Sequence, residues 1–404
     1  MRKRVMTALA AAAAVSLIVC AQASADEIKV WVADNTVEFT KAQTEAFKEA
    51  YPDFADYDIT VEPVGEGDAA GNMITDVSAG ADIFVFAQDQ IARLVTAGAL
   101  EEVAPDNVEA VVADNDAGAV GAATVGETLY AYPMTSDNGY FLYYDKSVVS
   151  DPSTLEGIIA DCEAAGKNFY MEINSGWYQT AFFFGTGAEL TYDTDDSGNF
   201  TACNASYASD AGLVALKKMI ELKASTAFQN GSAVGEATKV GAIVDGTWDS
   251  SAAQDLFGEN YACAKLPTFT GADGEIYQMS GFGGFKLLGV KPQEDMDKLD
   301  ACDALASFLS SGDVQLARYE AVGWGPSNLE AQKSDIVQAD VALSALAEQL
   351  AYTVPQGQYP GEYWTLATSL GDSIISGELT PDTSDDDLMA VLQKFEDTCR
   401  SYAE

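Results

Sequence analysis

The sequence predicts an α/β protein with two domains. Apolar strand-like segments at 28–32, 57–64 and 81–86 alternate with an amphipathic helix and a second helical segment at 69–77. This alternation is typical of a doubly wound lobe with a parallel core. A chain of 404 residues is also long enough for two domains with substantial cores. A later stretch, 240–269, again indicates strand, glycine turn, aromatic residue, helix and strand.

The first 25 residues are predicted to be a secretory signal and not part of the fold. Three basic residues precede an apolar run at 5–19, and Ala23-Ser24-Ala25 forms an A-x-A cleavage site. The apolar run is too short for a comfortable membrane span, and no later segment is a candidate. We therefore expect an exported protein of the periplasm or the extracellular cell surface. Lipidation of Cys20 is the alternative to cleavage after Ala25.

Composition excludes several classes of function. The net charge of −42 argues against nucleic acid or anionic lipid as partners. The sequence contains no histidine, which excludes Ser-His-Asp and Cys-His catalysis and His-ligated metals. Residues 193–198 imitate a calcium loop, but Asn204 stands where the closing glutamate is needed, so a hairpin turn is favoured and no metal or cofactor is expected. We also expect little side-chain titration between pH 5.5 and 8, and hence a nearly constant ligand affinity there.

Five cysteines follow the signal sequence, an odd number with no C-x-x-C spacing. Cys162 and Cys399 fall on apolar helix faces, so buried thiols are favoured, although the export compartment permits disulfides and one or two bridges stay open. The five positions are Cys162, Cys203, Cys263, Cys302 and Cys399.

The remaining elements are predicted in chain order from the same periodicities. Ser153 and Glu156 form a capping box for a helix that Gly166 ends, and Ser384 caps the last helix. Glycines at 281, 283 and 284 suit a segment that bends when domains move. The predicted strands are 128–133, 140–144, 169–173, 242–244 and 261–266, with helices at 153–165, 212–223, 250–256, 299–309 and 366–375.

Aromatic residues follow several strand-like segments, with carboxylates close by in the sequence. Phe86, Trp177 and Trp248 come at or after strand ends, and Trp364 lies in a late loop. A sugar ring needs this combination, because its C–H face stacks on an aromatic ring while its hydroxyls donate to carboxylates. The alternative for Trp248 is a core tryptophan, and Asp89 could instead cap the following helix. The nearby carboxylates are Asp89, Asp249 and Glu362.

Several of these segments resemble the maltose/maltodextrin-binding proteins, in the family of extracellular solute-binding proteins of ABC importers. They are ADIFVFAQDQ at 81–90, TLYAYP at 128–133, the Trp248 turn with LPTF at 266–269, and WGPSN at 324–328. The resemblance covers nearly the whole chain after the signal. It implies two lobes, each a mainly parallel sheet flanked by helices, joined by three hinge crossovers with the ligand between the lobes.

The resemblance also implies domain boundaries and a set of binding residues. The N-terminal lobe would comprise 26–134 and 281–328, and the C-terminal lobe 138–276 and 332–404. Gln90 departs from the family pattern, because arginine usually occupies that position. The implied ligand-binding residues are Phe86, Asp89, Asp137, Trp177, Tyr178, Trp248, Asp249 and Trp364, with Glu66 and Asp68 in a loop facing the cleft.

The sequence thus predicts a secreted, monomeric, non-enzymatic protein that binds malto-oligosaccharides and delivers them to the permease of an ABC importer. Only the permease, or a lipid on Cys20, would connect it with a membrane. One alternative is a secreted glycoside hydrolase acting through paired carboxylates. The other is a binding protein for a different sugar or small solute.

Overall fold

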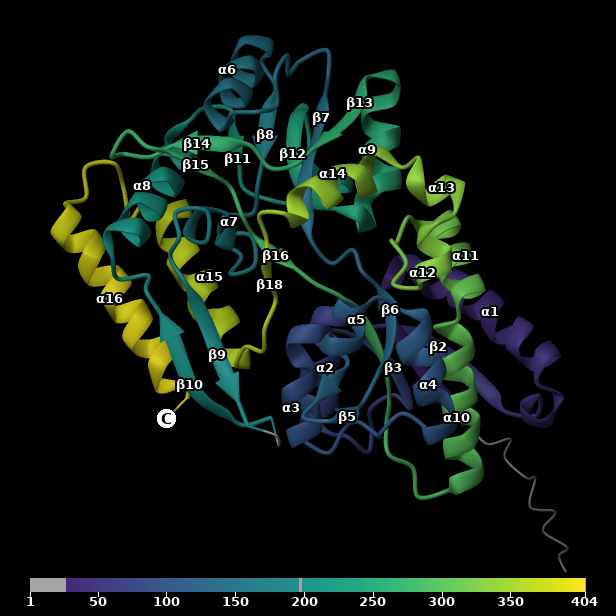
Figure 1. Ribbon diagram of the computed structural model, residues 1–404. Helices are drawn as coiled ribbons and strands as arrows, with labels where there is room; N and C mark the ends of the chain where they lie inside the picture. The colour runs from purple at the N-terminus through teal and green to yellow at the C-terminus, as the bar shows by residue number, and fades with distance from the viewer. Residues whose placement is uncertain (1–26, 196–197, 404) are drawn as a thin grey trace, which may run out of the picture.

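The computed structural model describes residues 27–195 and 198–403 and shows two lobes, each built on a five-stranded sheet (Figure 1). The predicted signal sequence and Cys20 lie outside the described residues. Within the described part of the chain, no helix is long and apolar enough to cross a membrane. The expectation of a two-lobed α/β fold is confirmed.

The N-terminal lobe contains the sheet β2-β1-β3-β17-β6, seen in the lower half of Figure 1. β1 pairs in parallel with β2 and β3, whereas β17 is antiparallel to both of its neighbours. The sheet is therefore mainly parallel, with one reversed strand that enters from the other lobe. Its strands are β1 (Glu27–Val32), β2 (Asp58–Pro63), β3 (Ile83–Ala87), β6 (Tyr132–Thr135) and β17 (Lys286–Val290).

The C-terminal lobe repeats this arrangement with the order β11-β8-β12-β7-β13. Here β7 is the reversed strand, antiparallel to β12 and β13, and it also enters directly from the other lobe. The strands are β7 (Tyr140–Asp145), β8 (Asn168–Tyr170), β11 (Phe228–Gln229), β12 (Val240–Gly246) and β13 (Tyr261–Ala264).

Helices cover both sheets and bury their apolar side chains in one cluster in the N-terminal lobe and two in the C-terminal lobe. Around the first sheet lie α1 (Val37–Ala50), α2 (Glu66–Thr75), α3 (Ile91–Thr96), α4 (Pro105–Asp114), α5 (Ala117–Ala122), α10 (Met296–Leu309) and α11 (Gly312–Val322). The second lobe carries α6 (Leu155–Ala165), α7 (Thr180–Phe183), α8 (Asp210–Ala224), α9 (Ser250–Phe257), α14 (Val341–Leu350), α15 (Gly361–Ile375) and α16 (Asp385–Ser401).

Three chain segments connect the lobes and hydrogen-bond to one another. The first joins β6 to β7, the second joins β16 (Phe282–Gly283) to β17, and the third carries α12 (Leu329–Gln332) and α13 (Asp335–Gln338) between α11 and α14. The Asn138 amide donates to the Gly284 carbonyl, and the Ser136 amide donates to the Gly325 carbonyl, each at 3.1 Å. These bonds tie the first segment to both of the others.

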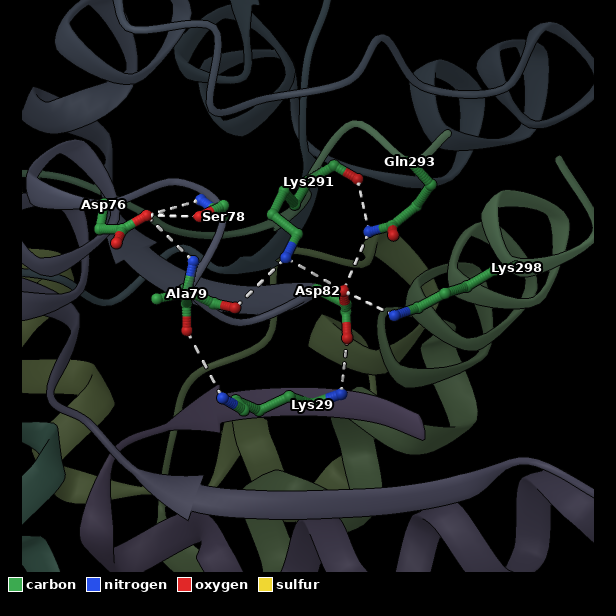
Figure 2. Close-up of polar contacts among 9 residues, drawn as sticks. Lys29, Asp76, Ser78, Ala79, Asp82, Lys291, Gln293 and Lys298 are labelled. Atoms are coloured by element: carbon green, nitrogen blue, oxygen red, sulfur yellow. Dashed lines mark hydrogen bonds and ion pairs between the residues drawn. The ribbon is translucent and has the colours of Figure 1, made fainter. Parts of the chain in front are cut away.

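A buried carboxylate links the three inner strands at one end of the N-terminal sheet (Figure 2). Asp82 Oδ2 accepts a hydrogen bond from the Lys29 amide of β1, and its Oδ1 lies 3.2 Å from Lys291 Nζ and 3.0 Å from Lys298 Nζ. Burial opposes ionisation of Asp82, but these hydrogen bonds and the two ammonium groups outweigh it and lower its pKa. The ionised carboxylate thus joins β1, the start of β3 and the end of β17.

The structure corrects several local expectations. Thr154, not Ser153, is the N-cap of α6, because its hydroxyl accepts from the Gly157 amide, while Glu156 instead bonds Lys218. The predicted strand 128–133 divides into β5 (Thr128–Leu129) and β6, which pair with different strands. The calcium-like segment leads from β9 (Leu190–Thr194) into β10 (Phe200–Ala205), an antiparallel hairpin, with residues 196 and 197 outside the described part. The five described cysteines are free thiols.

Candidate functional site

A cavity of about 1090 Å³ lies between the lobes. This volume is slightly above the range of roughly 300–1,000 Å³ for small-molecule sites, so the cavity suits an oligomer better than a single small ring. The cavity is lined by residues at the carboxyl ends of both sheets and by residues of the late loop before α15. The polar and aromatic lining residues are Glu66, Asp68, Asn72, Asp89, Gln90, Arg93, Asn138, Trp177, Tyr178, Trp248, Gln356, Glu362, Trp364 and Thr365.

The C-terminal lobe supplies the aromatic wall of the cavity. Trp177 lies in the loop after β8, and Trp248 lies in the short 3-10 turn that follows β12. Their ring centroids are 5.7 Å apart with an interplanar angle of 48°. Trp177 Nε1 donates a hydrogen bond to Gln356 Oε1 at 3.2 Å, which fixes the edge of its indole. The flat faces of half-buried indoles are surfaces on which a sugar ring can stack.

Trp364 extends this wall from the first turn of α15. Its ring centroid is 5.6 Å from Tyr359 and 4.9 Å from Tyr363, both buried, so packing fixes its orientation. Its Nε1 is buried and has no hydrogen-bond partner among the described residues. An indole N–H usually finds a partner when buried, so this donor is available to a ligand atom.

The N-terminal lobe supplies most of the charged wall. Asp89, in the turn that follows β3, is only 1% exposed although it lines the cavity. Burial raises the pKa of Asp89 to about 7, while the side chain of Gln90, which donates to Asp89, and the charge of Arg93 act in the opposite direction. Arg93 in turn donates to Gln90 Oε1 at 2.7 Å. Glu66, in the first turn of α2, completes this wall together with the exposed Asp68.

The loop before α15 bridges the two walls. Gln358 of the C-terminal lobe donates from Nε2 to the Gln88 carbonyl at 2.9 Å and accepts from the Ala92 amide at 3.0 Å. The Gln88 side chain also donates to the Gln356 carbonyl. The turn after β3, which carries Asp89, is therefore held directly against the opposite lobe.

Seven of the ten sequence-predicted residues line the cavity, and three do not. Phe86 is fully buried in the core of the N-terminal lobe, because β3 alternates its faces and presents Ala87 to the cavity instead. Asp137 is 2% exposed and engaged by Thr247, Gly325 and Lys286 of three other segments. Asp249 points away, with Oδ2 accepting from the Val234 amide at 2.8 Å.

The sequence does not point to six polar residues that line the cavity: Asn72, Gln90, Arg93, Asn138, Gln356 and Thr365. For Gln90 it indicates only a departure from the family pattern. Arg93 carries a usable signal, because it lies three residues after Gln90 at the start of α3, on the same side of the helix. Asn138 lies in the first connecting segment and Gln356 in the loop before α15, and periodicity does not reveal the path of either.

The cavity is not built around metal ligands. Among the residues that the structure describes, no group of three or more His, Cys, Asp or Glu side chains is arranged to hold a metal ion. What the cavity offers is stacking surfaces, hydrogen-bond acceptors and a few donors.

Comparisons with known proteins agree with this architecture. Residues 42–345 match the model of the family described as bacterial extracellular solute-binding protein. The chain belongs to this family. The expectation that it is an extracellular solute-binding protein is thereby confirmed, and the family consists of binding proteins. The comparison with curated proteins finds no match for the chain.

Solved structures of the same fold match over nearly their whole length. One, described as "with acarbose", is 26% identical, covers 94% of this chain and 100% of its own, and has a TM-score of 0.82. The ligand-free maltodextrin-binding protein MalE1 from L. casei is 24% identical, with coverages of 92% and 99% and a TM-score of 0.73. The Thermus thermophilus maltotriose-binding protein, bound with maltotriose, is 20% identical, with the same coverages and a TM-score of 0.75.

Proposed function

We propose that this solute-binding protein captures malto-oligosaccharides in the cavity between its lobes and delivers them to an ABC importer. One observation carries the proposal: the indoles of Trp177, Trp248 and Trp364 form one wall of a cavity whose other wall carries carboxylates. Sugar rings have apolar C–H faces and hydroxyl edges, so they match a site with stacking surfaces on one side and acceptors on the other.

The ligands of similar structures support the same class of solute. The names of three matched structures include maltotriose, maltotetraose and acarbose, all oligomeric in size. The cavity volume also favours an oligomer. Arg93 is the single arginine or lysine among the described residues that line the cavity, which disfavours anionic solutes, because these call for arginine clamps or clusters of backbone N–H groups.

Delivery would follow from closure of the lobes over the bound sugar. The three connecting segments are the only described backbone that continues from one sheet to the other, so they are the natural hinges. In the proposed role the exported protein acts as a monomer, and the closed form docks on the permease.

Calorimetry and thermal denaturation with maltotetraose test the proposal. At a hundredfold excess over Kd, the sugar should raise the free energy of unfolding by about 2.7 kcal/mol. Trp31→Phe is a suitable control, because Trp31 lies on β1 with its Nε1 bonded to Glu62, away from the cavity. No heat of binding and no thermal shift with maltotetraose would reject malto-oligosaccharides as ligands. Release of reducing sugar during incubation would instead support a glycoside hydrolase.

A further inference from the structure

Trp248 rests directly on a glycine two residues before it. A Cβ added to Gly246 would overlap with Cη2 and Cζ3 of the Trp248 ring. The backbone of Gly246 (φ −109°, ψ −175°) is an ordinary extended conformation that any residue adopts. The requirement for glycine here is thus the space that the indole occupies, not the backbone conformation.

A buried ammonium group contacts the same indole. Lys286 is fully buried, and its Nζ lies 5.2 Å from the ring centroid of Trp248 and 4.6 Å from that of Trp324. The Nζ group makes no hydrogen bond within the described chain, and its one close carboxylate is Asp137, at 3.6 Å. Contacts between a cation and the face of a tryptophan contribute more when the cation is removed from water, as the Lys286 ammonium is here.

The two groups that hold Trp248 come from different lobes. Gly246 ends β12 of the C-terminal sheet, whereas Lys286 begins β17 of the N-terminal sheet. Asp137, in the first connecting segment, also accepts from Thr247 Oγ1 and from the Gly325 amide, each at 2.5 Å. The orientation of Trp248 is therefore fixed where both lobes and all three connecting segments meet.

We propose that Gly246 and Lys286 are positioning residues that hold the Trp248 indole in the orientation needed to stack on the ligand. The proposal rests on the function proposed above and adds two residues that do not line the cavity themselves. Displacing the ring at either contact turns the stacking face away from the cavity. Because Lys286 belongs to the opposite lobe, the stacking surface is complete only while the lobes keep this arrangement.

Gly246→Ala is the decisive variant, with Gly121→Ala as its matched control. Gly121 lies in α5, where an added Cβ meets no atom within 4 Å. We expect Gly246→Ala to weaken maltotetraose binding about tenfold or more, ~1.4 kcal/mol, while Gly121→Ala binds as the wild type does. In a Trp248→Ala background, the glycine substitution should have no further effect, because the two changes act through one ring.

Fluorine NMR of protein labelled with 5-fluorotryptophan provides a readout that a general loss of stability would not reproduce. The Trp248 resonance, assigned from its absence in Trp248→Phe, should shift in Gly246→Ala while that of Trp31 stays constant. Lys286→Met combined with Asp137→Asn should shift it as well; the double change removes both members of the Lys286–Asp137 ion pair together.

The outcomes separate this proposal from the proposed function. An unshifted Trp248 resonance, or wild-type affinity in Gly246→Ala, would overturn the positioning role. So would a further loss of affinity when Gly246→Ala is added to Trp248→Ala. If the wild type does not bind maltotetraose, the proposed function fails, and the resonance shifts alone decide whether Gly246 and Lys286 orient the ring.

Discussion

Replacing Asp89 with asparagine should remove a pH dependence that the wild-type protein shows near neutrality. The absence of histidine led us to expect a nearly constant affinity between pH 5.5 and 8. The structure changes that expectation, because burial raises the pKa of Asp89 to about 7 inside the ligand cavity. A carboxyl group therefore titrates in the range where histidine usually does.

The size of the effect on stability follows from the difference in the pKa of Asp89 between the unfolded and folded states. A rise from 3.8 to about 7 corresponds to about 4 kcal/mol at ~1.36 kcal/mol per unit. Between pH 3.8 and about 7 the folded protein keeps a proton on Asp89 that the unfolded chain has already lost. The contribution of Asp89 to the free energy of unfolding is therefore fully present below pH 3.8 and is lost as pH rises toward 7. Burial also raises the pKa of Asp303 to about 6, so Asp303 makes stability depend on pH in the same direction. The informative quantity is therefore the difference in free energy of unfolding between wild type and Asp89→Asn at each pH.

Ligand affinity should change in the opposite direction with pH. A sugar hydroxyl that donates to Asp89 stabilises its ionised form, so maltotetraose should bind the wild type more tightly as pH rises through 7. Asp89→Asn should show a flat profile. Calorimetry from pH 5 to 9 at fixed ionic strength, together with urea unfolding of both proteins, measures both effects. The idea that burial raises the pKa of Asp89 would be refuted if the stability of both proteins changed with pH in parallel and the wild-type affinity did not change with pH.

Three further changes have defined outcomes. Trp364→Ala should weaken maltotetraose binding by about 1–3 kcal/mol if a sugar stacks as a nucleic-acid base does, and unchanged affinity by calorimetry would remove Trp364 from the site. Asp82→Asn should destabilise the protein at pH 7, because the ionised Asp82 is stabilised in the folded state and its pKa is lowered. This contribution to stability is present above pH 3.8 and is lost as pH falls through the folded-state pKa. The difference in free energy of unfolding between wild type and Asp82→Asn, measured with urea, should therefore shrink at acidic pH. Extensive EDTA treatment should leave maltotetraose affinity unchanged, and a large loss would reveal a metal requirement.

The fold was predictable because local pattern and tertiary structure agree in most elements. The strands at 28–32 and 81–86 were expected within one or two residues, since a continuous apolar run between turns leaves few alternatives. The reversed direction of β7 and β17 was not predictable from periodicity. That direction depends on where the chain crosses between lobes, and apolar alternation is the same for a strand running either way.

The site was predictable where a glycine turn delivers an aromatic residue beyond a strand. Trp177 and Trp248 both reach the cavity for this reason. Phe86 does not, because a one-residue change along a strand moves a side chain to the opposite face. The carboxylates Asp137 and Asp249 were misplaced for another reason: their hydrogen-bond partners are 15 to 188 residues away, and nothing local reveals them.

The division of the cavity between the lobes explains how binding and closure can be coupled. Trp177 and Trp364 belong to the C-terminal lobe and are held by residues of that lobe, so we expect a sugar to stack on them before the lobes approach each other, whereas Trp248 also contacts Lys286 of the N-terminal lobe. The carboxylates Glu66, Asp68 and Asp89 belong to the N-terminal lobe, and their hydrogen bonds form only when that lobe reaches the sugar. The contribution from stacking on Trp177 and Trp364 would then be common to the open and closed states, whereas the charged acceptors and the Lys286 contact of Trp248 would favour the closed state. A ligand shifts a conformational equilibrium only by its difference in affinity for the two states, so in the proposed function we expect the N-terminal residues, rather than Trp177 and Trp364, to drive closure.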